Sequence, residues 1–120
     1  MRRLALLIGL CVVSGCITPS IPIPPPDPAK MVFEVDGTGG TAVFSYPPDV
    51  NYQGALVFVF NRDRGVGVIQ QANDDGSVGP TQPLAAAVDE QLVVTFQRDD
   101  QTVSTCIRLR NGNQDPTNYC

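Results

Sequence analysis

Four cysteines carry the most reactive side chains of this 120-residue sequence, which contains no histidine. Without an imidazole, the chain cannot assemble a Ser-His-Asp triad or pair a cysteine nucleophile with histidine. The thiols are therefore left with disulfide formation and covalent modification, and their positions decide between the two. Two of them, Cys11 and Cys16, lie near the start of the chain, and the other two, Cys106 and Cys120, lie near its end.

Paired carboxylates are the second group that could carry chemistry. General acid–base catalysis needs one carboxyl group whose pKa is raised by an apolar setting. The pairs Asp74/Asp75, Asp89/Glu90 and Asp99/Asp100 fall in predicted solvated turns. We therefore predict no enzyme activity and no cofactor. Calcium takes about six to eight oxygen ligands. Asp74, Asp75, Asp99 and Asp100 are candidate calcium ligands if their turns meet at one end of the fold. Aspartate is also an ordinary turn residue, and both interpretations stay open.

Residues 1–15 have the layout of an export signal. Two arginines precede an apolar run, Leu4–Val13, that is too short to span a bilayer. The next residues, Val13-Ser14-Gly15-Cys16, resemble the lipobox of bacterial lipoproteins, although Val is less usual than Leu at its first position. The resemblance implies cleavage before Cys16 and diacylation of its thiol, which would anchor the mature chain in a lipid bilayer. A plain signal peptide followed by a chance cysteine is the alternative.

The residue after the anchor bears on the location of the protein. In the lipoprotein family an Asp at this position retains the protein in the inner membrane, and this chain has Ile17. The resemblance therefore implies an envelope protein of the outer membrane that faces the periplasm or the cell surface. The expected partners are the lipid bilayer, through acylated Cys16, and an unidentified envelope protein.

A proline-rich segment follows the anchor. Six of the fourteen residues 17–30 are proline, which excludes a helix or a sheet interior. Such a segment favours polyproline II at about 3.1 Å per residue, so we expect a tether over residues 16–30 with a reach of up to ~40 Å. A ligand for a proline-recognition domain is the alternative.

The charge of the chain excludes one class of partner. The net charge is −4, and because Arg2 and Arg3 lie in the removed signal, the mature chain would carry −6. Nucleic-acid binding needs a basic surface that displaces counterions, so we expect no nucleic acid. The same charge argues against electrostatic attraction to anionic lipids.

From residue 31 onward the hydrophobic pattern has a period of two, which is typical of strands. Seven short segments separated by turn-forming residues predict one small antiparallel β-sandwich over residues 31–120. The expected strands are Met31–Asp36, Thr41–Tyr46, Ala55–Phe60, Val66–Gln71, Leu84–Val88, Gln91–Arg98 and Thr102–Arg110.

Alternation within these strands assigns side chains to the core. The expected core residues are Phe33, Ala42, Phe44, Tyr46, Phe58, Leu92, Val94, Phe96, Val103, Thr105, Ile107 and Leu109. The run Leu56–Phe60 is apolar on both faces and predicts a central strand. Val57, Val59 and Val93 then fall on the opposite face, which we expect loops to cover in part. If that face is open to water, it would be a patch for a partner.

Residues 55–109 resemble the Ig-like and fibronectin-III-like modules of bacterial surface proteins. The resemblance rests on Asn61 to Gly65, Val66-Gly67-Val68, Asp75-Gly76-Ser77-Val78, Leu84 to Ala87, Asp89 to Val94, Asp99-Asp100 and Ser104. The usual Gly-Asp before the sixth strand is Val88-Asp89 here. The resemblance covers about half the chain and implies a fold rather than an activity.

Export would place Cys106 and Cys120 in an oxidising compartment, where disulfides persist. A bridge between them would close a loop of about 15 residues and contribute about 3 kcal/mol. Free thiols and a link to another chain are the alternatives. With Cys16 acylated, two cysteines and no histidine cannot complete a zinc shell.

These patterns together predict a lipid-anchored envelope protein whose β-sandwich is a non-catalytic interaction or structural module. The alternative function is a ligand-binding module for calcium or carbohydrate. The scarcity of aromatic residues, which make up 7% of the chain, weighs against a stacking platform for sugars.

Overall fold

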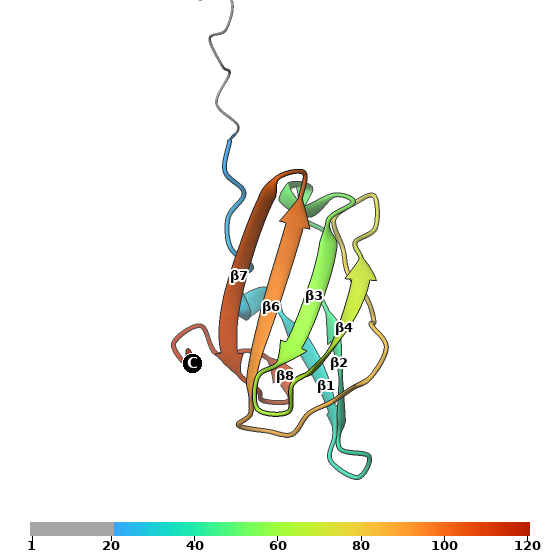
Figure 1. Ribbon diagram of the computed structural model, residues 1–120, viewed down its shortest axis with the longest axis vertical. Helices are drawn as coiled ribbons and strands as arrows, with labels where there is room; N and C mark the ends of the chain where they lie inside the picture. The colour runs from blue at the N-terminus through green and yellow to red at the C-terminus, as the bar shows by residue number, and fades with distance from the viewer. Residues whose placement is uncertain (1–20) are drawn as a thin grey trace, which may run out of the picture.

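The computed structural model of the chain describes residues 21–120, which form two antiparallel four-stranded sheets packed face to face (Figure 1). One sheet has the order β5-β2-β1-β8 and the other β4-β3-β6-β7. The strands are β1 Val32–Asp36, β2 Thr41–Ser45, β3 Leu56–Asn61, β4 Val66–Gln71, β5 Leu84–Ala85, β6 Gln91–Arg98, β7 Gln101–Arg108 and β8 Gly112–Asn113. The predicted small β-sandwich is therefore confirmed, with eight strands in residues 21–120.

Within each sheet, strands that follow one another are joined by hairpins that the turn residues predict. β1 pairs with β2, β3 with β4, and β6 with β7, while β3 and β6 join two hairpins into one sheet. Constant-type immunoglobulin domains place their fourth strand in the sheet of the first strand. Here β4 lies beside β3 in the other sheet, so it forms the edge of the sheet that carries most of the apolar residues.

The core lies between the sheets and is centred on aromatic side chains. The ring of Tyr52, in the short 3-10 helix η2 (Val50–Tyr52), stacks on Phe96 with centroids 4.2 Å apart. Tyr46 meets both rings edge-on, at 5.7 and 5.3 Å. Most of the predicted core is confirmed as buried, namely Phe33, Ala42, Phe44, Tyr46, Leu92, Val94, Phe96, Ile107 and Leu109, whereas Val103 and Thr105 are half-buried.

The predicted faces of β3 are wrong. Val57 and Val59 are buried, whereas Phe58 is half-buried on the outer face of the sheet. The cause is the register with β6, in which Val57 lies opposite Phe96 and Val59 opposite Val94. Directly opposed residues in a sheet share a face, so the clearly amphipathic β6 forces the valines of β3 inward. Val93 lies on the outer face, as predicted.

Two strand boundaries differ from the expectation. The strand expected over residues 84–88 ends at Ala85, because the chain turns at Asp89, whose φ of 75° is left-handed, and the Glu90 carboxylate accepts a hydrogen bond from Ala87 N. The two-residue strand β8 was not expected. It forms because Gln114, which is buried, bonds through its side chain to Arg110 N, Arg110 O and Gly112 O and folds the tail back onto β1.

The proline-rich segment lies against the sandwich over residues 21–30, which we call the arm. The sequence predicts an extended tether here, but Pro26 and Pro28 are buried and the arm runs beside β7 (Figure 1). Asp27 caps the 3-10 helix η1 (Pro28–Lys30) by accepting a hydrogen bond from Ala29 N at 2.9 Å. The estimated reach of ~40 Å therefore does not describe these ten residues.

Truncation of a phenylalanine should destabilise the protein far more on the inner face of the second sheet than on its outer face. Phe96→Ala should lower the free energy of unfolding by about 3–5 kcal/mol, because the ring is fully buried between Tyr46 and Tyr52. Phe60→Ala is the matched control and should cost about 1 kcal/mol or less, since its ring is 43% exposed. Urea denaturation of both variants measures the difference, and equal losses would contradict the assigned faces.

Candidate functional site

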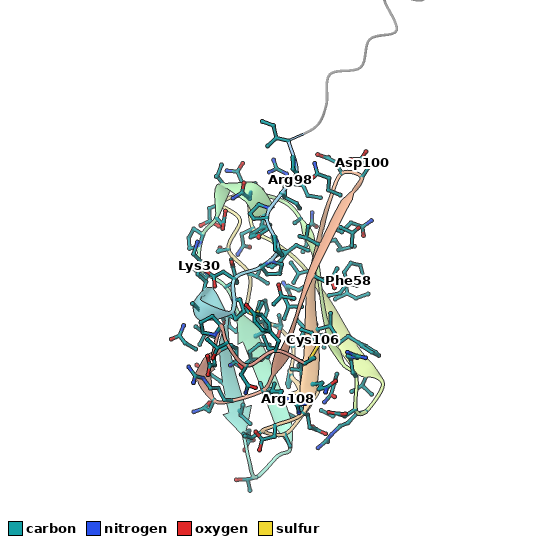
Figure 2. The ribbon with its side chains drawn as sticks, turned by 90° about the vertical axis from the view of Figure 1, so that its left-hand side faces the viewer. Lys30, Phe58, Arg98, Asp100, Cys106 and Arg108 are labelled. Carbon is teal, nitrogen blue, oxygen red and sulfur yellow. A yellow bond between two sulfur atoms is a disulfide. The ribbon has the colours of Figure 1, made fainter. Side chains whose placement is uncertain are left out.

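The most distinctive surface of the described residues is an apolar stripe on the outer face of the β4-β3-β6 part of the sheet. We define the apolar stripe as Leu56, Phe58, Phe60, Ile69 and Val93. Ile69 is 65% exposed, Phe60 43% and Leu56 39%. Figure 2 shows Phe58 projecting outward from the sheet. The sequence analysis expected loops to cover this face in part, and no loop buries these side chains.

A shallow hollow lies within the stripe. It has a volume of about 250 Å³ and is lined by β3 and β4. Its floor is open because Gly67 lies opposite Phe60 and has no side chain. A Cβ at this position would lie 2.7 Å from Val59 O and 3.3 Å from the Phe60 ring, so the ring covers the glycine backbone. Such an aromatic–glycine pair across strands compensates for the missing side chain of the glycine.

The charged side chains on the outer face of the sheet itself are basic, while Asp63 and the Asp74-Asp75 turn lie at its margins. Arg62, Gln91 and Arg108 form a row across the outer face at one end of the sheet, since Gln91 pairs with Arg108 and Arg62 N bonds to Gln91 O. The outward positions of β3, β4, β6 and β7 include no Asp or Glu. In an acidic chain this face is therefore apolar with a basic end, and Figure 2 shows Arg108 at the end away from Asp100.

Hydrogen bonds from side chains hold the arm. Gln101 accepts from Ile23 N at 2.6 Å and donates to Ile21 O at 3.0 Å. Tyr52 and Thr105 donate to Pro24 O and Pro26 O, each at 2.6 Å. Proline has no N–H but keeps its carbonyl, so these donors bind the arm through the groups it still offers. Sequence reasoning missed this contact because hydropathy does not report carbonyl acceptors.

A groove of about 710 Å³ remains between the arm and the C-terminal tail. The hydroxyls of Tyr46 and Tyr52 lie at its inner end, where Tyr46 accepts a hydrogen bond from Asp27 N at 3.2 Å. Burial raises the pKa of both tyrosines above the usual value of 10.0. Both hydroxyls stay protonated at neutral pH, and that of Tyr52 already donates to Pro24 O.

The predicted cysteine pair lies at the rim of this groove. Cys106 and Cys120 are disulfide-bonded, with Cα atoms 5.5 Å apart, which is within the usual range. The intramolecular pairing is the alternative that the structure supports. Tyr119 forms a bridge with Ile107, so the disulfide holds the tail along the lower half of the edge of β7.

The candidate calcium ligands do not form a cluster. Within residues 21–120, no three carboxylate, thiol or imidazole side chains gather where they could hold a metal. The Asp75 carboxylate accepts hydrogen bonds from Ser77 N and Ser77 Oγ, which lower the pKa of this exposed group. Asp75 O bonds to Asp49 N, and a Cβ at Gly76, whose φ is 82°, would lie 1.7 Å from Asp49 O. This turn therefore packs against Asp49.

The pairing of Arg64 and Glu90 is structural. Arg64 Nε donates to Glu90 at 2.9 Å and lowers the pKa of this carboxyl group, with help from Ala87 N and Asn61. Asn61, which is buried, accepts from Asp63 N and Arg64 N and donates to Ala85 O. The Asn61–Gly65 motif of the resemblance is therefore a turn that ties β3 to the loop after β5.

Several expectations fall outside the described residues. These are the signal over residues 1–15, the acylation of Cys16 and residues 17–20 of the tether. In residues 21–120, no helix combines the length and the apolar character that crossing a bilayer requires.

The tyrosine contact with the arm predicts a pH dependence. Because the folded state raises the pKa of Tyr52, its stabilising effect is complete below pH 10 and is lost as the pH rises above it. Tyr52→Phe should cost about 0.5–1.5 kcal/mol at neutral pH and should weaken this alkaline loss. Urea denaturation at pH 7 and pH 10.5 measures both. Tyr119→Phe, with an exposed ring, is the control at pH 7, and an unchanged Tyr52→Phe protein would contradict the assignment.

Comparison with known proteins identified no relative of this chain. No protein-family model matches the chain, and neither a curated protein nor a solved structure matches it.

Proposed function

We propose that this protein is a lipid-anchored protein of the bacterial envelope whose β-sandwich binds a protein partner through the apolar stripe. The observation that supports binding is the stripe itself, in which Leu56, Phe60 and Ile69 are each at least 39% exposed on one face. Exposed apolar surface that is contiguous costs solubility, and its usual role is contact with another molecule. The row of arginines at one end suits a partner with carboxylates beside its apolar surface.

Lipid anchoring through Cys16 is proposed from the lipobox resemblance. The arm is compatible with it, because Ile21 is 87% exposed at the end of the sandwich where the β6–β7 turn lies (Figure 1). Residues 21–28 are bonded to the sandwich, so only the residues between Cys16 and Ile21 would separate the anchor from the fold. At about 3.3–3.6 Å per residue, they allow a reach of under ~20 Å.

The anchor is tested by fractionation. The full chain, expressed in a bacterium that exports and acylates lipoproteins, should sediment with membranes and incorporate labelled palmitate. Cys16→Ser should remove the label and release the protein into the soluble envelope fraction, since a diacyl anchor is needed for stable attachment. Cys11→Ser is the matched control and should behave as the wild type. An unlabelled wild-type chain in the soluble fraction would refute the anchor.

The stripe is tested by a double substitution on the membrane-attached chain. Phe58→Ser with Phe60→Ser should abolish stoichiometric co-purification of the envelope partner after chemical cross-linking and detergent extraction. Val50→Ser with Val88→Ser is the matched control, because these side chains are 69% and 51% exposed outside the stripe. The control should retain the partner. Loss of the partner in both variants, or in neither, would show that the stripe is not the contact surface.

A further inference from the structure

The edge of β4 is the one long strand edge in residues 21–120 to which no other segment of the chain hydrogen-bonds. At the opposite edge of the same sheet, the arm binds at Gln101 and Thr105 and the tail bridges Ile107. The edge strands of the other sheet, β5 and β8, have two residues each. Covered or short edges normally prevent strand pairing between molecules. By contrast, β4 (Val66–Gln71) has six residues and no charge or proline.

The backbone of β4 offers a regular set of free groups at this edge. Ala72 N donates to Ala55 O at 2.7 Å, which places the hydrogen-bonded pairs of the β3–β4 ladder at alternate residues. Gln70 and Val68 therefore bond to β3. Gly67, Ile69 and Gln71 turn their N–H and C=O groups outward, away from the sheet.

We propose that β4 pairs with β4 of a second copy of this chain, in antiparallel orientation, around a two-fold axis at Ile69. Ile69 then faces Ile69 of the second copy, and Gly67 of each copy faces Gln71 of the other. All three outward residues exchange hydrogen bonds with their opposites, because an isologous contact repeats each pair. The two sheets become one sheet of eight strands, and the exposed Ile69 side chains cover each other.

The charges beside β4 fit a second copy. The turn before β4 carries Arg62 and Arg64, and the turn after it carries Asp74 and Asp75. In the proposed register each basic turn comes beside the acidic turn of the other copy. Arg64 of the basic turn is already paired with Glu90, and the acid within that turn, Asp63, accepts a hydrogen bond from Gln91 N at 2.7 Å. Arg62 is therefore the charge that this turn offers to the acidic turn of the other copy. Each copy therefore has a basic turn at one end of β4 and an acidic turn at the other, and the antiparallel pair brings opposite charges together at both ends.

This inference goes beyond the proposed function, since it concerns the backbone edge of β4 and a second copy of this chain; the two surfaces share one side chain, Ile69. A contact of six residues per copy is small and gives a weak pair in solution. Confinement of both copies to one membrane would raise their effective concentration. The pair should therefore be tested on the membrane-attached full chain.

Cysteine cross-linking tests the register. In the wild-type background, Ile69→Cys should give a disulfide-linked dimer in membranes treated with an oxidant, because opposed hydrogen-bonded residues have Cα atoms about 5.5 Å apart. Gln71→Cys lies on the same edge and is equally able to collide, but in this register its two copies are separated by about four residues, or ~14 Å. It should cross-link at least about tenfold less. Equal cross-linking of both variants, or of neither, would overturn the proposal.

A charge test does not depend on cross-linking. With two differently tagged copies in one cell, Ile69→Lys should reduce mutual co-purification about tenfold or more, because it opposes two lysines on the axis. Ile69→Lys with Ile69→Glu should restore it. Undiminished pairing of the lysine variant, or no restoration in the mixed pair, would overturn the proposal. Partner capture that depends on Phe58 and Phe60 but survives Ile69→Lys would leave the proposed function standing.

Discussion

The position of β3 between β4 and β6 is the constraint on which the rest of the surface depends. Its sequence, Leu56 to Phe60, is apolar at every position, so either face could be buried. β6 removes this freedom, because Leu92, Val94 and Phe96 alternate with polar residues and Val57 and Val59 must follow them into the core. Asn61 then closes the strand with a buried amide that is fully bonded to Ala85, Glu90 and the following turn. The phenylalanines of β3 are left outside as a direct consequence.

The sequence predicted those parts of the fold in which one local signal dominates. Alternation in β6 and the turn residues around the hairpins placed most strands within two residues of their observed bounds. It did not predict the face of β3, because two apolar faces carry no alternation and the answer comes from a strand more than thirty residues away. β8 was missed because its two residues depend on the side-chain bonds of Gln114. The sequence left open whether the acidic turns meet, and the turn at Gly76 packs on Asp49.

The arm and the tail protect the same strand edge through different interactions. Both cover the edge of β7, where an extended backbone would otherwise be free to pair with another molecule. The tail does so as a short bridge locked by the Cys106–Cys120 disulfide. The arm cannot form a ladder, because its prolines have no N–H, and its carbonyls accept instead from Tyr52 and Thr105. Because the arm and the tail both protect β7, the bare edge of β4 is an exception within this sheet.

The proposed pair and the proposed anchor constrain each other. Antiparallel pairing of β4 reverses the long axis of one copy, and the arm runs roughly along that axis beside β7 (Figure 1). The first residues of the arms of two paired copies therefore lie at opposite ends of the pair. Because the arm is bonded to the sandwich from Ile21 onward, only the few residues up to Cys16 can bend back toward a bilayer. On one membrane the pair must lie with its strands along the bilayer plane. The apolar stripes of both copies then form one surface, with the arginine rows at its two ends, so a partner that spans the pair would need carboxylates at both ends of its own apolar face.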